Sequence, residues 1–192
     1  MIADIDRHMW RCSAEILKRW ESIQRSDLFI SVNVSPKDFF FIDVFEQLKK
    51  TVREYDISPS RLRIEITESV MMNDSSYVMD ILKKLRDEGF IIEMDDFGSG
   101  YSSLNMLKDM PVDVVKVDMK FIEDTDGLSR SSIILRNVLN MMSQLGMVSL
   151  TEGVEKEDQF RSLARMGCVL FQGYLFGKPM PVEEFEKAYQ IK

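Results

Sequence analysis

A polar residue that can bind a metal or move a proton stands at the end of each short apolar run in this chain. The set comprises Asn33, Glu65, Asp95, Asp96, Lys116, Asp118, Glu152 and Gln172. Carboxylate and amide oxygens are the ligands that Mg²⁺ and Mn²⁺ prefer. Two such ions can activate a water and stabilise the leaving oxygen of a phosphodiester, and a lysine among the acids suits the charge of the transition state.

Each of these residues also has a purely structural interpretation. Asn33 and Gln172 are typical turn residues, and Asp95 with Asp96 is a typical helix cap. Lys116 and Asp118 alternate with valines and could simply form an ion pair, while Glu152 could begin a helix. A carboxylate at Glu65, inside a strand that should be buried on both faces, is costly unless it is paired or bound to a metal.

Short apolar runs alternate along the chain with amphipathic segments. Strands are predicted at Leu28–Val32, Leu62–Ile66, Phe90–Met94, Val112–Val117, Met147–Leu150 and Cys168–Phe171. Helices are predicted over 4–22, 42–55, from Asn73 or Asp74 to Gly89, 101–108, 129–145, 155–166 and from Pro181 onward. This alternation indicates βαβ units in one parallel α/β sheet, with residues 1–192 as a single domain. In a (β/α) barrel the carboxyl ends of the strands surround one active-site mouth.

The composition of the chain excludes several classes of protein. Its 192 residues carry a net charge of −7, which argues against a partner such as DNA or RNA. His8 is the only histidine, so neither a His-rich metal site nor an evident Ser-His-Asp triad exists. The cysteines, Cys12 and Cys168, fit no metal or redox spacing. We therefore expect a cytoplasmic protein, with no membrane contact within this chain.

Six segments, taken in order, closely resemble the successive motifs of the EAL-domain cyclic di-GMP phosphodiesterase family. They cover nearly the whole chain, and together they are highly specific. They read SVNVS from Ser31, RIEITES from Arg63, DDFGSGYSSL from Asp95, VKVD from Val115, TEGVE from Thr151 and QGYLFGKP from Gln172.

The resemblance implies a modified (β/α)8 TIM-type barrel that hydrolyses cyclic di-GMP to linear pGpG with Mg²⁺ or Mn²⁺ (two ions). It implies that Asn33, Glu65 and Asp95 are metal ligands, with Asp95 bridging the ions and Asp96 binding the second one. Glu152 matches the essential glutamate, as a ligand or as the base for the attacking water. Lys116 matches the residue that positions the water, supported by Asp118 and Gln172.

The resemblance also implies regulatory features. Glu68 matches the glutamate that anchors the loop after Asp96, a loop that contains Gly98, Ser99 and Gly100. In the family this loop and the following helix communicate with a dimer interface. We therefore expect a homodimer formed through the region after Asp96, and an upstream sensory or GGDEF domain in the parent protein.

The Glu-Ala-Leu segment that gives the family its name does not occur in the sequence. The resemblance therefore indicates an N-terminally truncated member, an incomplete barrel with about six of the strands present. We expect the isolated chain to hydrolyse cyclic di-GMP weakly or not at all and to self-associate through its strand edges. Two alternatives remain open: a non-hydrolysing cyclic di-GMP receptor, and a barrel enzyme acting on another phosphate ester.

Overall fold

A computed structural model describes residues 2–72, 75–98, 104–118 and 129–191 of the chain. The chain forms two compact units, Met1–Glu93 with Met180–Lys192, and Met94–Pro179. Within the described residues no helix is both long enough and apolar enough to cross a membrane.

The first unit begins with a long helix that packs on two parallel strands. Its elements are α1 (Ile2–Ser22), β1 (Ile30–Asn33), α2 (Asp38–Phe41), α3 (Val44–Glu54), η1 (Pro59–Arg61), β2 (Leu62–Thr67), η2 (Glu68–Met72), α4 (Ser75–Asp87), the start of β3 (Ile92–Phe97) and α8 (Val182–Ala188).

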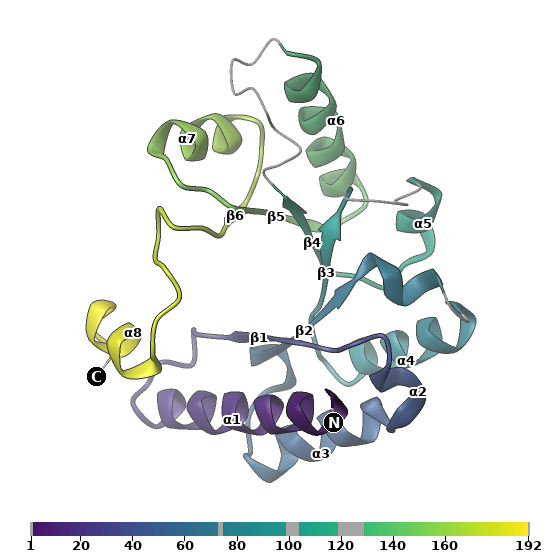
Figure 1. Cartoon of the computed structure of the whole chain (residues 1–192), viewed down its shortest axis with the longest axis vertical. Helices are drawn as coiled ribbons and strands as arrows, with labels where there is room; N and C mark the ends of the chain where they lie inside the picture. The colour runs from purple at the N-terminus through teal and green to yellow at the C-terminus, as the bar shows by residue number, and fades with distance from the viewer. Residues whose placement is uncertain (1, 73–74, 99–103, 119–128, 192) are drawn as a thin grey trace. The chain divides into compact units, whose positions relative to one another are not determined.

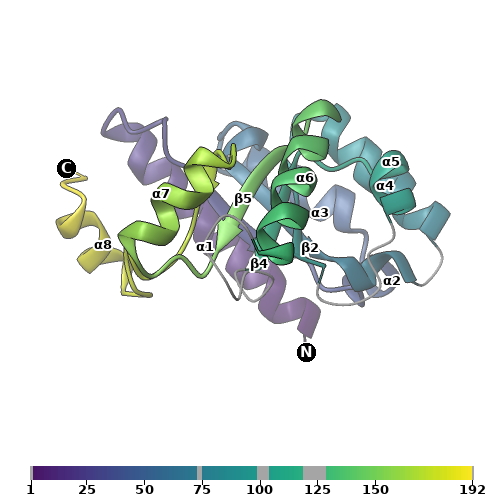
Figure 2. The same cartoon turned by 90° about the horizontal axis from the view of Figure 1, so that it is seen from above.

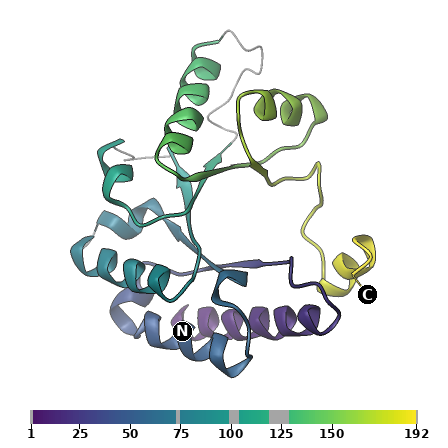
Figure 3. The same ribbon diagram turned by 180° about the vertical axis from the view of Figure 1, so that it is seen from behind.

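Helices α1 and α3 lie side by side, and α1 packs against β1 and β2, as Figures 1 and 3 show from opposite sides. Trp10, Ala14 and Leu17 recur at helical spacing on α1 and are fully buried. Asp43 caps α3 by accepting a hydrogen bond from the Glu46 N–H at 3.0 Å. The buried face of α1 therefore provides the support on which β1 rests.

The second unit continues the alternation of strands and helices. Its elements are the rest of β3, α5 (Leu104–Asp109), β4 (Val114–Asp118), α6 (Arg130–Gln144), β5 (Val148–Glu152), α7 (Glu157–Arg165) and β6 (Leu170–Phe171). Helix α6 runs beside β5 in Figure 2, and Ser129 caps it by accepting from the Ser132 N–H at 3.1 Å. The core of the unit includes Val115, Leu135 and Met142.

The strands pair in parallel and follow chain order in the sheet, β1-β2-β3-β4-β5-β6. Asn33 is the register partner of Glu65, and Asp118 is the register partner of Glu152. The α/β class with six parallel strands is therefore confirmed. The prediction that residues 1–192 form a single domain stays a prediction.

Several element boundaries differ from the sequence-based expectation, and two of the differences are informative. Strand β3 does not end at Met94 but continues through Asp95 and Asp96 to Phe97. Aspartate is unfavourable in strands, yet Asp96 is exposed and Asp95 only half-buried at this end. The helix predicted over 42–55 begins instead at Val44, after the separate short helix α2, because the Asp43 cap starts a new helix.

Candidate functional site

In the first unit, Asn33 and Glu65 stand next to each other at the carboxyl ends of two parallel strands. They are register partners on β1 and β2, and the Val34 N–H donates to the Glu65 carbonyl at 2.9 Å. The indole Nε1–H of Trp10 donates to the Asn33 carbonyl at 3.0 Å. Because its backbone is held on both sides, Asn33 presents an exposed side-chain amide from a fixed position.

In the second unit, Lys116 lies between two carboxylates. Its Nζ is 2.6 Å from Glu152 Oε1 and 3.3 Å from Asp95 Oδ1. The lysine side chain is only 4% exposed, against 19% for Asp95 and 21% for Glu152. A cation this deeply buried is stable only when paired, so the two acids and the lysine form one electrostatic cluster.

The pKa of Glu152 is raised above its usual range. Burial is the main cause, the negative charge of Asp95 adds to it, and the ammonium of Lys116 acts in the opposite direction. A carboxylate held in this way binds a proton more readily than one in water. Glu152 is therefore suited to accept a proton during a reaction.

Three further predicted residues lie at the same ends of the strands. Asp118 is half-buried on β4, next to Glu152 in register. Asp96 is exposed and has the left-handed φ of 58°, a conformation that aspartate tolerates better than most residues. Gln172, which follows β6, is exposed, and its backbone bonds to Thr151 and Val154 at 2.8 and 3.0 Å.

The predicted loop anchor lies just beyond β2. Glu68 opens η2 and is 8% exposed, so its carboxylate is well buried. Gly98 follows β3 with φ of +92°. Ser99 and Gly100 lie outside the described residues, and the anchoring role of Glu68 stays a prediction.

The donor set suits a hard divalent cation by its chemistry. It offers carboxylate and amide oxygens and no sulfur or imidazole. Within the described ranges, no group of three or more His, Cys, Asp or Glu side chains is close enough to hold a metal ion. In the second unit the ammonium of Lys116 stands between Asp95 and Glu152.

Sequence reasoning missed a charged network on the first three strands. Glu93 is 1% exposed, and it accepts a hydrogen bond from Ser31 Oγ at 2.7 Å and pairs with Arg63 at 3.0 Å. Each member lies two residues before a predicted metal ligand, at Asn33, Glu65 or Asp95. This spacing is visible in the sequence, but it does not reveal the network, because the pairing of these side chains depends on the register between the strands.

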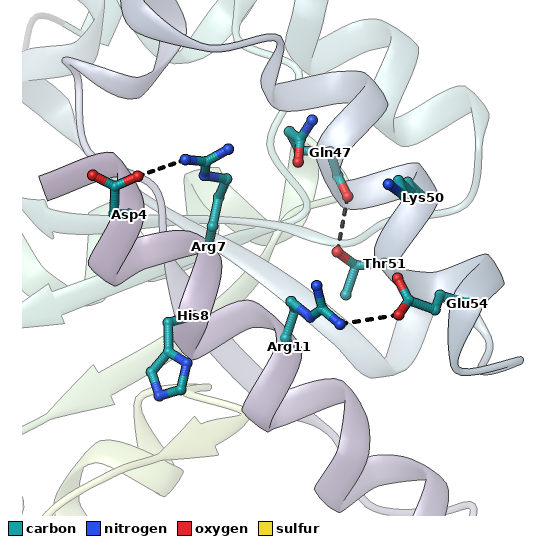
Figure 4. A pocket seen from close by; sticks show the side chains of 8 residues that line it. All are labelled: Asp4, Arg7, His8, Arg11, Gln47, Lys50, Thr51 and Glu54. Atoms are coloured by element: carbon teal, nitrogen blue, oxygen red, sulfur yellow. Dashed lines mark hydrogen bonds and ion pairs between the residues drawn. The ribbon is translucent and has the colours of Figure 1, made fainter. Parts of the chain in front are cut away.

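A separate groove lies between α1 and α3, with a volume of about 390 Å³. Figure 4 shows Arg7 pointing to Asp4 and Arg11 to Glu54, and both arginines form ion pairs with these acids. The groove contains none of the predicted site residues. Both of its arginines are paired with carboxylates, and Lys50 is a further cation in its lining.

Comparison with known proteins identifies the class. A family profile described as "EAL domain" matches residues 1–179. The chain belongs to the EAL domain family.

Individual relatives agree with this assignment. The chain is 36% identical over 170 residues to "Cyclic di-GMP phosphodiesterase PA2567" of Pseudomonas aeruginosa, covering 88% of this chain and 29% of that protein. Among solved structures, "PaMucR Phosphodiesterase, c-di-GMP complex" gives a TM-score of 0.87 at 33% identity, covering 96% of this chain and 80% of that one.

A structure of a manganese complex is also similar. It is "Klebsiella pneumoniae BlrP1 pH 9.0 manganese/cy-diGMP complex", with a TM-score of 0.77 at 27% identity over 90% of this chain and 45% of that one. The chain spans only a fifth of the length of one curated relative and 29% of another. The predicted fold class, an EAL-type barrel fold represented by about six strands, is confirmed by these matches.

Proposed function

We propose that the protein carrying this chain is a phosphodiesterase that hydrolyses cyclic di-GMP to linear pGpG. The observation that carries the proposal is the buried Lys116 held between Asp95 and Glu152 at the carboxyl ends of parallel strands. Relatives named as cyclic di-GMP phosphodiesterases, and a similar structure solved with that nucleotide, support the choice of substrate.

Each predicted residue has a role in this proposal. Asn33, Glu65, Asp95, Asp96 and Glu152 provide oxygen ligands for two Mg²⁺ or Mn²⁺ ions. When bound, these ions supply a more acidic water and stabilise the negative charge on the leaving oxygen.

The protein's own side chains then handle the proton and the charge. Glu152, whose pKa is raised by burial, takes the proton of the attacking water. One phosphorus–oxygen bond forms to that water and one breaks to the leaving ribose oxygen, which takes a proton from solvent while Glu152 releases its proton to solvent, so that one water is consumed overall. Lys116 positions the attacking water, and Asp118 and Gln172 support it from the neighbouring strand ends.

The finer expectations belong to the same proposal. The active protein is a homodimer formed through the region after Asp96, and Glu68 anchors that region. Further sensory or GGDEF domains accompany this chain, and the reaction takes place in the cytoplasm. The dimer, the Glu68 anchor and the further domains take no part in the bond-breaking step.

The test is a product analysis of the purified protein that carries this chain. With Mn²⁺ or Mg²⁺ we expect conversion of cyclic di-GMP to pGpG, and no conversion after the ions are chelated. Tight binding of cyclic di-GMP without turnover would instead favour a receptor. Equal cleavage of an unrelated phosphate ester would contradict the proposed substrate.

A further inference from the structure

Three charged or polar side chains, Ser31, Arg63 and Glu93, form a network across β1, β2 and the start of β3. Both carboxylate oxygens of Glu93 are occupied, Oε2 by the Ser31 hydroxyl at 2.7 Å and Oε1 by the Arg63 guanidinium at 3.0 Å. Glu93 is 1% exposed. Burying such a pair costs free energy, and an apolar replacement of similar volume is often as stable. Stability alone therefore gives little reason for this network.

The network lies directly beneath the predicted ligands of the first unit. Ser31 and Arg63 are register partners, as are Asn33 and Glu65 two residues later. Side chains two apart on a strand point to the same face and are separated by about 7 Å. Glu93 therefore links Ser31 on β1 to Arg63 on β2, two residues along the strands before Asn33 and Glu65.

The Arg63 side chain is engaged by Phe29 and Glu93. Its guanidinium carbon lies 3.3 Å from the centre of the Phe29 ring, which comes before β1. Phe29 precedes Ser31 in the chain, so the guanidinium is directed toward the amino ends of the strands, away from Glu65. Arg63 therefore influences Asn33 and Glu65 through Glu93 and the backbone.

We propose that Glu93, held by Ser31 and Arg63, is a positioning residue that fixes the spacing of β1 and β2 beneath Asn33 and Glu65. It thereby sets the affinity of this ligand pair for a divalent cation. The inference rests on the proposed function, because it takes Asn33 and Glu65 as metal ligands. Residues that orient metal ligands through a second layer of contacts typically change metal affinity 10- to 100-fold.

Two substitutions separate positioning from simple charge. Glu93→Gln removes the negative charge that faces the Arg63 cation, whereas Arg63→Met removes the positive charge that faces the Glu93 carboxylate. If only net charge mattered, Glu93→Gln would weaken binding of a divalent cation and Arg63→Met would strengthen it. If positioning matters, both substitutions weaken binding. Ser31→Ala removes one hydrogen bond, changes no charge and is the mildest of the three.

The affinity of the 192-residue chain for Mn²⁺ is measured from the electron paramagnetic resonance signal of the free ion. We expect Glu93→Gln and Arg63→Met each to weaken binding by about tenfold, and Ser31→Ala by about threefold. Glu88→Gln is the matched control, since Glu88 pairs with Lys49 at 2.7 Å outside the network. That control should bind Mn²⁺ as the wild type does.

A second readout needs no metal. The Val34 N–H bonds to the Glu65 carbonyl at 2.9 Å, so its hydrogen exchange reports the spacing at the ligand level. We expect this exchange to be about tenfold faster in Glu93→Gln, with no change at the Ile57 N–H that follows α3. Wild-type protection at Val34 in all three variants would overturn the positioning role, as would tighter Mn²⁺ binding by Arg63→Met. A wild-type chain that binds no Mn²⁺ would contradict the metal site itself, and exchange at Val34 would still decide the positioning.

Discussion

Replacing Lys116 by methionine should destabilise the chain because it removes the cation from a buried cluster. The lysine is 4% exposed, and its two acidic partners are each about one-fifth exposed. Removing one member of a buried ion pair typically costs 3–5 kcal/mol. The partial exposure of Asp95 and Glu152 reduces this value, so we expect a loss of about 3 kcal/mol at neutral pH.

The loss should depend on pH in a definite direction. The pKa of Glu152 is already raised by burial, and it rises further when Lys116 no longer stabilises the carboxylate. A carboxyl with a raised pKa in the folded state contributes most to stability at low pH, and that contribution is lost as the pH rises through the folded pKa. The deficit of Lys116→Met should therefore be small near pH 4 and complete at pH 7.5.

Urea unfolding followed by circular dichroism measures both effects. Lys49→Met is the matched control, because Lys49 pairs with Glu88 at 2.7 Å in a more exposed setting. We expect the control to cost less than about 1 kcal/mol at either pH. A loss below about 1 kcal/mol for Lys116→Met at neutral pH would refute the account of Lys116 as the centre of a buried cluster.

Three other substitutions test particular features. Asp38 is fully buried, and burial together with Asp6 raises its pKa to about 6, so Asp38→Asn should stabilise the chain by about 1–2 kcal/mol at pH 7.5 and not at pH 4, as measured by urea unfolding. Gly173→Ala should cost more than about 2 kcal/mol in thermal unfolding, since its added Cβ would lie 2.2 Å from the Val154 carbonyl oxygen. Asp96→Asn should unfold at the wild-type temperature, whereas Asp96→Ala should lose about 1 kcal/mol because φ is 58° at this position.

Much of the fold follows from local patterns in the sequence. Strands are short apolar runs and helices carry one apolar face, so their alternation is readable without any long-range information. Because parallel strands end at one edge of a sheet, the approach of Lys116 to its neighbours could be expected as well. The structure bears this out for Asp95 and Glu152 within the second unit.

Other features depend on information that a single sequence does not carry. The Ser31–Arg63–Glu93 network requires the register between strands, and apolar alternation alone does not determine which residues become partners. The extension of β3 through Asp95 and Asp96 was missed because aspartate is unfavourable in strands. Aspartate is tolerated here because this end of the strand is partly exposed to water. The burial of Asp38 likewise depends on how α1 packs above α2.

The central claim is that the protein carrying this chain hydrolyses cyclic di-GMP with Glu152 in the chemical step. The turnover of cyclic di-GMP by the Glu152→Gln variant of that protein tests it most directly. The variant should fold normally and still bind cyclic di-GMP, because glutamine keeps the size and one oxygen of the glutamate. Its kcat in Mn²⁺, measured by chromatography of pGpG, should fall below about one-tenth of the wild-type value, a barrier increase of more than about 1.4 kcal/mol. A variant that keeps more than that tenth would contradict the assignment of Glu152 to the chemical step.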